Sequence, residues 1–322
     1  MPVRPSLRPL LALATALDRP QPGLSVAERR EAAATGPLQM RYVTSRSSVP
    51  LEVSDRRIPV AGGEISVRIY RPRRRAAGAG RLPVHLFMHG GSFWLGSVAE
   101  YEPLCRWYAG SVGCVVVSVE YRLAPEFPYP AGVEDCYAAL VWVAQTADEL
   151  GVDPDRLSIG GVSAGGTLAA AIALLARDRS GPRIILQALE IPATDLTMSQ
   201  PSIEEFAVGY SMTRASLIEA YGFYLPEPAT AREAYASPLL AADLTDLPPA
   251  FVLTCECDPL RDEGEAYARR LRESGGAATV HRVGGHVHGS IYLTRFLPSA
   301  RKAVESTCRA LTTAYATARG RH

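Results

Sequence analysis

A serine at a sharp turn is the residue of this chain best suited to act as a nucleophile. Ser163 lies in the pattern G-x-S-x-G of Gly161–Gly165. The run Arg156–Gly160 reads as a short strand, and the small-residue run Thr167–Leu175 reads as a helix. Glycines suit such a turn because its strained backbone packs so closely that larger side chains would clash. The pattern also occurs by chance in glycine-rich loops, so its meaning depends on whether partners for Ser163 exist.

The first partner required is a carboxylate, which orients the imidazole that takes the proton of the serine. Asp258 directly follows the strand-like run Phe251–Glu256. An Asp before Pro259 also suits the cap of a helix, but its position after a late strand favours the catalytic interpretation. Asp262 is expected to cap or brace the same loop. We therefore interpret Asp258 as the acid of a catalytic triad.

The second partner is a histidine, and two histidines compete for this role. His286 and His288 both lie in the segment Gly284–Gly289, which follows the last strand-like run and is expected to be a loop. Local sequence does not decide between them. His85 and His281 lie inside strand-like runs, and we expect His85 to be packed in the core.

A loop of small residues, His89-Gly90-Gly91-Ser92, follows an earlier strand-like run. Backbone N–H groups of such a loop can approach the oxyanion of a tetrahedral intermediate, because no side chains intervene. We expect the N–H groups of Gly90, Gly91 and Ala164 to form this oxyanion hole. His89 is expected to brace the loop rather than to act as a base. A flexible glycine turn is the alternative, and the serine turn at Gly161–Gly165, further along the chain, disfavours it.

Composition and charge restrict the possible partners. The 322 residues are 47% hydrophobic and 21% charged, with a net charge of +1, which gives no general attraction to nucleic acid or anionic membranes. The run Arg71–Arg75 could bind phosphate, but the small residues after it favour a solvated loop. No apolar run is long enough for a membrane span, and Leu10–Leu17 is expected to be a cap helix rather than a signal segment. We expect a cytoplasmic protein, either a monomer or a homodimer.

The cysteines give no sign of a metal or redox site. Cys255 and Cys257 lack the two-residue gap of a redox or zinc pair, and no other Cys/His pair has metal-ligand spacing. Together with Cys114 they lie in apolar strand-like runs, where cysteine is usually a small buried hydrophobe. We expect reduced thiols, no metal and no cofactor.

The order of elements predicts one α/β core with helical additions. Residues 1–45 are expected to form N-terminal cap helices, broken at Asp18–Gly23. Residues 46–194 and 237–322 alternate strands and helices as a largely parallel sheet does, after a hairpin around Gly62-Gly63. Residues 195–236 interrupt this alternation with an aromatic, helical cap insertion. The expected strands are 53–59, 65–70, 84–88, 114–119, 156–160, 184–189, 250–256 and 278–283, and further helices are expected at 101–111, 133–150 and 299–319.

Taken together, these motifs resemble those of the hormone-sensitive-lipase-like bacterial esterases, the HGGG or family IV carboxylesterases. The resemblance implies an α/β-hydrolase fold, with a mostly parallel eight-stranded sheet, helices on both faces and a helical cap. It implies Ser163 as nucleophile and Asp258 as acid, and it selects His288 over His286 as the base. The matching motifs appear in the family's order and span most of the chain: His89-Gly90-Gly91, Tyr121–Glu126, Gly161–Gly166, Asp258–Asp262 and His288-Gly289.

Four residues depart from the family pattern. Ser92 replaces the third loop glycine, Val162 precedes the nucleophile, Glu120 precedes the Tyr-Arg motif, and Ser290 follows His288-Gly289. None of these changes removes a catalytic group. Together they indicate an altered hydrogen-bond network behind the elbow and a pocket unlike the usual one.

The sequence therefore predicts a serine carboxylesterase that cleaves short- to medium-chain or aromatic esters through an acyl-enzyme. Aromatic residues in the segment 195–236 favour a compact apolar site over a lipid interface. An alternative is the same triad acting on a lactone, amide, carbamate or biosynthetic intermediate by hydrolysis, acyl transfer or elimination. A remote alternative is a non-catalytic ligand receptor on this fold, as the plant gibberellin receptors illustrate by resemblance. Such receptors typically lose a triad member, whereas all three groups are present in this sequence.

Overall fold

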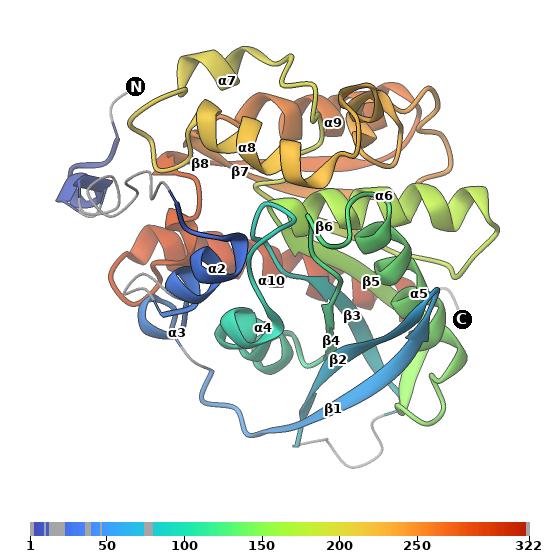
Figure 1. Cartoon of the computed structure of the whole chain (residues 1–322). Coiled ribbons are helices and arrows are strands. Elements are labelled where there is room, and N and C mark those ends of the chain that lie inside the picture. The colour runs from blue at the N-terminus through green and yellow to red at the C-terminus, as the bar shows by residue number, and fades with distance from the viewer. Residues whose placement is uncertain are drawn as a thin grey trace.

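A twisted sheet forms the centre of the molecule, with its strands in the order β1-β2-β4-β3-β5-β6-β7-β8 (Figure 1). The computed structural model describes residues 3–9, 11–12, 23–35, 40–45, 47–73 and 80–319, and the eight strands are counted over these residues. β1 pairs antiparallel with β2 and β2 with β4, whereas the other neighbours are parallel. The expected mostly parallel sheet is confirmed. The strands are β1 (Leu51–Val60), β2 (Gly63–Pro72), β3 (Leu82–Met88), β4 (Val115–Glu120), β5 (Val152–Val162), β6 (Gln187–Glu190), β7 (Ala250–Cys257) and β8 (Ala278–Val287).

Helices cover both faces of the sheet, because alternate residues of its strands are apolar in both directions. In β3, Leu86 belongs to the core on the side of α5 and α6, while its neighbour Phe87 packs with Tyr108 of α4. Helices α5 (Ala131–Gln145), α6 (Ala164–Asp178) and α9 (Arg261–Glu273) cover one face. Helices α4 (Val98–Val112) and α10 (Pro298–Arg319) cover the other, next to the short α3 (Met40–Val43).

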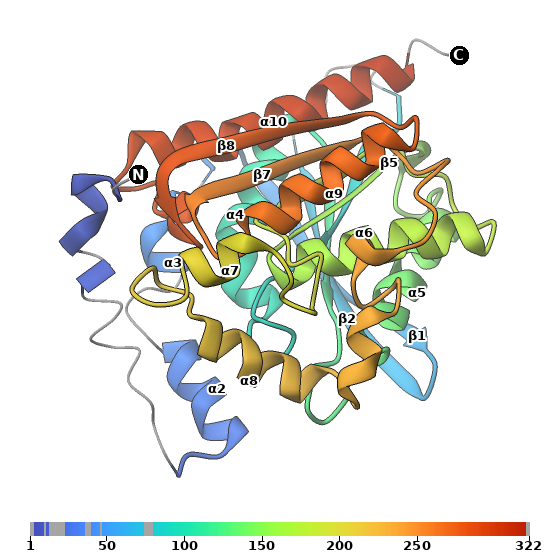
Figure 2. The ribbon, with the colours of Figure 1, turned by 90° about the horizontal axis from the view of Figure 1, so that it is seen from above.

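The N-terminal segment and residues 195–236 add helices outside this sandwich. They are η1 (Pro5–Leu7), α2 (Val26–Thr35), α7 (Pro201–Glu205), α8 (Arg214–Tyr224) and η2 (Pro228–Arg232); the short η3 (Pro238–Leu240) and η4 (Ser290–Tyr292) belong to other loops. Figure 2 shows α2 beside α8, and the guanidinium of Arg29 forms two hydrogen bonds of 2.9 and 2.7 Å with the carboxylate of Glu219. Helix α2 buries none of its residues, so charged contacts rather than an apolar stripe hold it in place.

Several element boundaries differ from those expected. The strand expected at 278–283 continues to Val287, so His286 lies in β8 and not in a loop. The glycine pair Gly284-Gly285 does not end the strand, because an irregularity after Cys255 of β7 restores pairing between Cys257 and Val287. Helix α5 ends at Gln145, five residues before the expected end at 150, and the following turns still bury apolar side chains. β6 begins at 187 instead of 184.

Other expectations fall partly outside the described residues. Arg71 and Pro72 belong to β2 rather than to a loop, and Arg73 is exposed, whereas residues 74–79 are not described. Residues 18–22 of the expected helix break at 18–23 and most of the apolar stretch 10–17 also lie outside the described residues. All six cysteines are buried, as expected for Cys114, Cys255 and Cys257. No helix in the described part of the chain has the length and apolar character needed to cross a membrane.

Candidate active site

Ser163 occupies the turn between β5 and α6 with a strained backbone. Its φ and ψ angles are 54° and −118°, and its N–H donates to the Glu190 carbonyl at 2.8 Å. A Cβ on Gly161 would lie 2.4 Å from the carbonyl oxygen of Gly165, and one on Gly165 would lie 2.1 Å from that of Met88. Both positions therefore require glycine, and the elbow expected from the pattern G-x-S-x-G is present.

Three side chains from different strand ends form a chain of hydrogen bonds. The Ser163 hydroxyl lies 3.1 Å from Nε2 of His288, and Nδ1 of His288 lies 2.8 Å from Oδ2 of Asp258. The side chains of His288 and Asp258 are 11% and 1% exposed, so little water reaches the inner pair. This arrangement can take a proton from the serine while the carboxylate holds the imidazole in one tautomer.

Each carboxylate oxygen of Asp258 has a hydrogen-bond partner of its own. Oδ1 accepts a hydrogen bond of 2.9 Å from the Leu260 N–H before α9, while Oδ2 faces His288. The hydrogen bond from Leu260 thus fixes the carboxylate and leaves one oxygen for the imidazole. Asp262 instead braces residues outside the loop, since its Oδ2 accepts from the Ser202 N–H of α7 at 3.0 Å.

His286 points away from this chain of hydrogen bonds. Its Nδ1 lies 2.9 Å from Oγ of Ser290 and its Nε2 lies 2.8 Å from Oγ of Ser299. Burial and the nearby charge of Arg4 lower the pKa of His286 to about 4. His286 is therefore a neutral packed residue, and of the two candidate histidines only His288 contacts Ser163.

The loop after β3 also differs in detail from the expectation. The His89 ring stacks on Tyr121 with 4.2 Å between the ring centroids, and its Nδ1 lies 2.8 Å from the Gly90 carbonyl oxygen. His89 is thus the brace that was expected. The hydroxyl of Tyr101, however, packs against Gly90, 2.5 Å from the place that a Cβ would occupy, and Gly90 does not line the pocket beside Ser163.

Gly91 and Ser92 reach the pocket instead, with φ angles of 128° and 53° that turn the loop toward Ser163. Among the described residues, the N–H groups of Gly91, Ser92 and Ala164 have no hydrogen-bond acceptor. Ala164 is buried at the first position of α6, where helical N–H groups lack a partner within the helix. Gly91 and Ser92 therefore line the pocket with N–H groups that lack an acceptor, and the Ala164 N–H lies at the start of the helix that follows Ser163.

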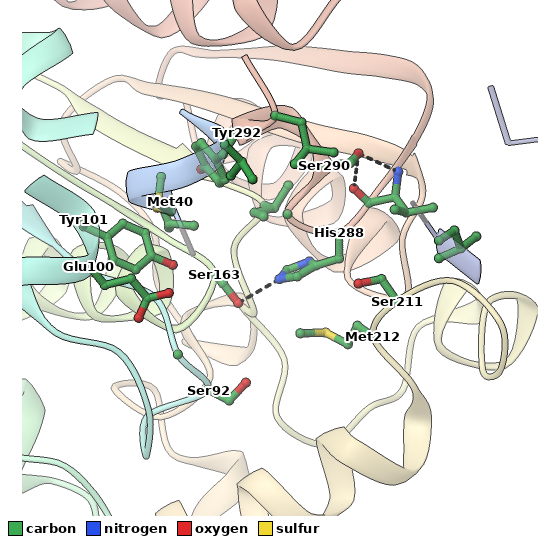
Figure 3. Close-up of a pocket in the computed structure, with 18 of the residues that line it drawn as sticks. Met40, Ser92, Glu100, Tyr101, Ser163, Ser211, Met212, His288, Ser290 and Tyr292 are labelled. Carbon is green, nitrogen blue, oxygen red and sulfur yellow. Dashed lines mark hydrogen bonds between the residues drawn. The ribbon is translucent and has the colours of Figure 1, made fainter. Parts of the chain in front are cut away.

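A pocket of about 320 Å³ opens onto Ser163 and His288 (Figure 3). Its wall combines the loops around Ser92 and His288 with residues that the sequence analysis did not assign individually to a site. No sequence signal marks these residues, because apolar side chains in distant segments meet only in the folded chain. They are Leu7, Leu11, Met40 and Val43 from the N-terminal segment, Glu100 and Tyr101 from α4, Ile191, Ser211 and Met212, and Tyr292 and Leu293.

A family model described as the alpha/beta hydrolase fold matches residues 85–292, which include Ser163, Asp258 and His288. The chain belongs to the α/β-hydrolase family. It is 39% identical over 257 residues to carboxylesterase NlhH of Mycobacterium tuberculosis, covering 79% of this chain and 80% of that protein. An arylesterase of Saccharolobus solfataricus is 40% identical over 258 residues, with 80% of each protein covered. The chain spans 66% of the carboxylic ester hydrolase LipN of M. tuberculosis, at 41% identity over 254 residues.

Solved structures of esterases superpose on almost the whole α/β-hydrolase chain. A hyperthermophilic esterase of the archaeon Pyrobaculum calidifontis gives a TM-score of 0.90 at 41% identity, covering 97% of this chain and 99% of that one. A thermostable esterase of Pseudomonas putida gives a TM-score of 0.89 at 34% identity, with 97% of each chain covered. The resemblance to hormone-sensitive-lipase-like carboxylesterases is thereby confirmed.

Residues that depart from the family pattern have structural partners of their own. Glu120 accepts a hydrogen bond of 2.9 Å from the Val98 N–H at the start of α4, and burial raises the pKa of its carboxyl. Ser290 accepts from the Val287 N–H at 3.0 Å and fixes the His286 ring. Val162 is buried beside the elbow and lines the pocket.

Two buried acids lie close to the hydrogen-bonded chain without joining it. Glu190 accepts from the hydroxyls of Tyr108 and Tyr292, and burial raises its pKa to about 7. Burial also raises the pKa of Glu263 well above its usual range, and the charges of Asp195 and Asp258 add to this rise. Among the described residues, Asp258 is the carboxylate that is hydrogen-bonded to the imidazole of His288. The described residues contain no cluster of His, Cys, Asp and Glu arranged to hold a metal.

Proposed function

We propose that this α/β-hydrolase is a serine carboxylesterase that hydrolyses short- to medium-chain or aromatic esters of small molecules. The observation that carries the proposal is the hydrogen-bonded chain from Ser163 through His288 to Asp258, which opens onto the pocket. Esterases and carboxylesterases among the similar proteins support it. The pocket volume suits small ester groups rather than a long lipid chain.

In the proposed reaction Nε2 of His288 takes the Ser163 proton as the serine oxygen attacks the ester carbonyl carbon. The carbonyl oxygen becomes an oxyanion held by backbone N–H groups. When this intermediate collapses, His288 returns the proton to the departing alcohol, which leaves an acyl group on Ser163. Water then attacks the acyl group by the same route and releases the acid. Asp258 orients His288 throughout.

We assign the oxyanion hole to the N–H groups of Gly91, Ser92 and Ala164. Gly90, which the sequence suggested, packs against the Tyr101 hydroxyl and does not line the pocket, whereas Gly91 and Ser92 do. Because the donor at position 92 is a backbone group, serine can supply it as well as glycine, despite the positive φ of 53°. The Ser92 side chain then remains in the pocket wall and is available to the substrate.

We further propose that residues 1–45 and 195–236 form a cap over the pocket, since both contribute lining residues. Met40 comes from the first segment and Met212 from the second, and both lie around Ser163 in Figure 3. The division of the core into 46–194 and 237–322 belongs to this proposal. A cytoplasmic location and a homodimer stay predictions from the sequence.

The test is hydrolysis of p-nitrophenyl butyrate by wild-type protein and by variants of the proposed triad. Ser163→Ala and His288→Ala should each lower kcat by at least about a thousandfold, because the members of a triad act as one unit. His286→Ala is the matched control: it removes a buried imidazole that does not contact Ser163, so kcat should fall far less.

Two other outcomes would replace the proposal. A Ser163→Ala variant with undiminished turnover would remove the serine mechanism. Wild-type protein that neither cleaves esters nor reacts at Ser163 with a fluorophosphonate would favour the receptor alternative. Cleavage of lactones or amides in preference to esters would keep the mechanism and change the substrate class.

A further inference from the structure

Glu100 is an acidic side chain in the wall of the active-site pocket. It belongs to the first turn of α4, and among the described lining residues it is the one carboxylate, while none is Lys or Arg. In Figure 3 its carboxyl group is turned toward the side of the pocket that holds Ser163. A charged group in this position faces whatever ester binds there.

The local sequence offers Glu100 a structural role that the structure does not use. Ser97 and Glu100 have the spacing of a capping box, in which the glutamate would bond back to the N–H of the serine. Only one half forms: the Ser97 hydroxyl accepts from the Glu100 N–H at 3.2 Å. Helix α8 shows both halves of the same motif, between Thr213 and Ser216. The next N–H of α4, that of Val98, is satisfied by Glu120.

The Glu100 carboxyl therefore has no hydrogen-bond or ion-pair partner among the described residues. The neighbouring acid Glu102, by contrast, pairs with Arg106 at 2.7 Å and with Arg68 at 3.3 Å. Burial raises the pKa of Glu100, as it does for a carboxyl that lacks a cationic partner. Placing a cation in the pocket would supply the missing partner and stabilise the ionised form.

Aromatic groups complete the surroundings of such a cation. Tyr101 and Tyr292 line the same pocket as Glu100, and tyrosine rings attract ammonium groups through their negative faces. Because the lining residues include no Lys or Arg, an anionic substrate would gain no side-chain partner there and would meet Glu100 as a like charge. The wall thus distinguishes cations from anions of similar size.

We propose that Glu100 forms a subsite for a positively charged group, and that the preferred substrates are esters carrying an ammonium group near the scissile bond. The inference rests on the proposed esterase function and names the substrate class. Glu100 is here a specificity residue and takes no part in bond cleavage.

Two matched pairs of esters test this subsite. The first pair is acetylcholine and its carbon isostere, in which a tert-butyl group replaces the trimethylammonium group of the alcohol. The second pair consists of two p-nitrophenyl butyrates. One carries a trimethylammonium group on its acyl chain, and the other carries a tert-butyl group at the same place. A quaternary ammonium keeps its charge at every pH, so within each pair only the charge differs. The measured quantity is the ratio of kcat/KM for the charged ester to that for the neutral one at pH 8.

In wild-type protein at least one pair should favour the charged ester by about tenfold, which corresponds to about 1.4 kcal/mol. Glu100→Gln should reduce that ratio to about one, and Glu100→Lys should make the neutral ester preferred. The ratio cancels any effect of a substitution that acts on both esters alike. Glu102→Gln is the matched control, because it removes a carboxylate two residues away that does not line the pocket, and its ratio should equal that of wild type.

The outcomes separate this inference from the proposed function. Hydrolysis of the neutral isosteres without a preference for either charged ester would overturn the cation subsite and leave the esterase function standing. An unchanged preference in Glu100→Gln would also overturn it. Failure of wild-type protein to hydrolyse any of the four esters would count against the esterase function itself.

Discussion

Glu190 is a buried carboxyl whose titration should be visible in the stability of the whole protein. Its side chain is 1% exposed and accepts from two tyrosine hydroxyls, Tyr108 and Tyr292, while its backbone carbonyl anchors the N–H of Ser163. Burial outweighs these two hydrogen bonds and raises its pKa from 4.5 to about 7. Since one pKa unit is about 1.4 kcal/mol, ionising Glu190 in the folded protein costs about 3 kcal/mol more than in the unfolded chain.

The sign of the effect follows from the raised pKa. Below pH 4.5 the carboxyl is protonated in both the folded and the unfolded protein, and it adds no penalty. As the pH rises from 4.5 to about 7 the unfolded chain ionises first, so the contribution of Glu190 to folding stability is lost. Between pH 5 and pH 8 this loss is about 2–3 kcal/mol. Glu190→Gln cannot ionise and should not show it.

The assay is urea denaturation of wild type and Glu190→Gln at pH 5 and pH 8. Between pH 5 and pH 8 the unfolding free energy of the variant should rise by about 2–3 kcal/mol relative to that of wild type. Burial also lowers the pKa of His85, His89 and His286, which gives an opposite slope. Those histidines are common to both proteins, so their contribution cancels in the difference.

Glu273→Gln is the control, since it removes an exposed carboxylate, and its difference from wild type should be small at both pH values. A constant offset between Glu190→Gln and wild type is expected, because the amide changes the hydrogen bonds to the tyrosines. A difference that varies by less than about 1 kcal/mol between the two pH values would refute the reasoning, since Glu190 would then titrate alike in both states.

Two further substitutions test the elbow and the attachment of α2. Gly165→Ala places a Cβ 2.1 Å from the Met88 carbonyl oxygen and should destabilise the protein by at least about 2 kcal/mol in thermal denaturation. Gly222→Ala is the control: its Cβ would have no atom within 4 Å, so this substitution should stabilise the protein by about 0.5–1 kcal/mol. An equal effect of both would contradict the packing argument. Arg30→Met removes one ion pair and two hydrogen bonds to backbone carbonyls from a helix that buries no residue, so limited proteolysis near α2 should become faster. Arg56→Met, at an exposed strand position, should leave the cleavage rate unchanged.

The sequence was sufficient for those parts of the site that are determined within a few residues. The turn around Ser163 depends on glycines that are adjacent in the chain, and Asp258 is marked by the strand before it. The choice between His286 and His288 depended on where β8 ends, and the glycines at 284 and 285 suggested an end that is too early. The family resemblance selected His288, and its contact with Ser163 is consistent with that choice.

The direction of backbone groups and the residues of the pocket wall could not be predicted from the sequence, because both depend on how distant elements pack. Whether Gly90 or Ser92 lines the pocket depends on the φ angles of the loop and on its packing against Tyr101, which comes from the next helix. Leu7 and Tyr292 meet in one pocket although they are far apart in the chain. Such contacts follow from how the elements pack, and no local pattern encodes them.

The residues of the hydrogen-bonded chain and the residues of the pocket wall are held by different parts of the fold. Ser163, Asp258 and His288 each follow a strand of the sheet, and additional hydrogen bonds fix the first two: the Ser163 N–H to β6, and Asp258 to the backbone before α9. The surrounding side chains come from elements outside the sheet. Met40 lies on the short helix α3, Met212 lies in a loop, and Glu100 lies at the start of α4. Substitutions in the wall can therefore change which ester binds without altering the hydrogen-bonded chain, whereas substitutions at the elbow act on the fold and the chemistry together.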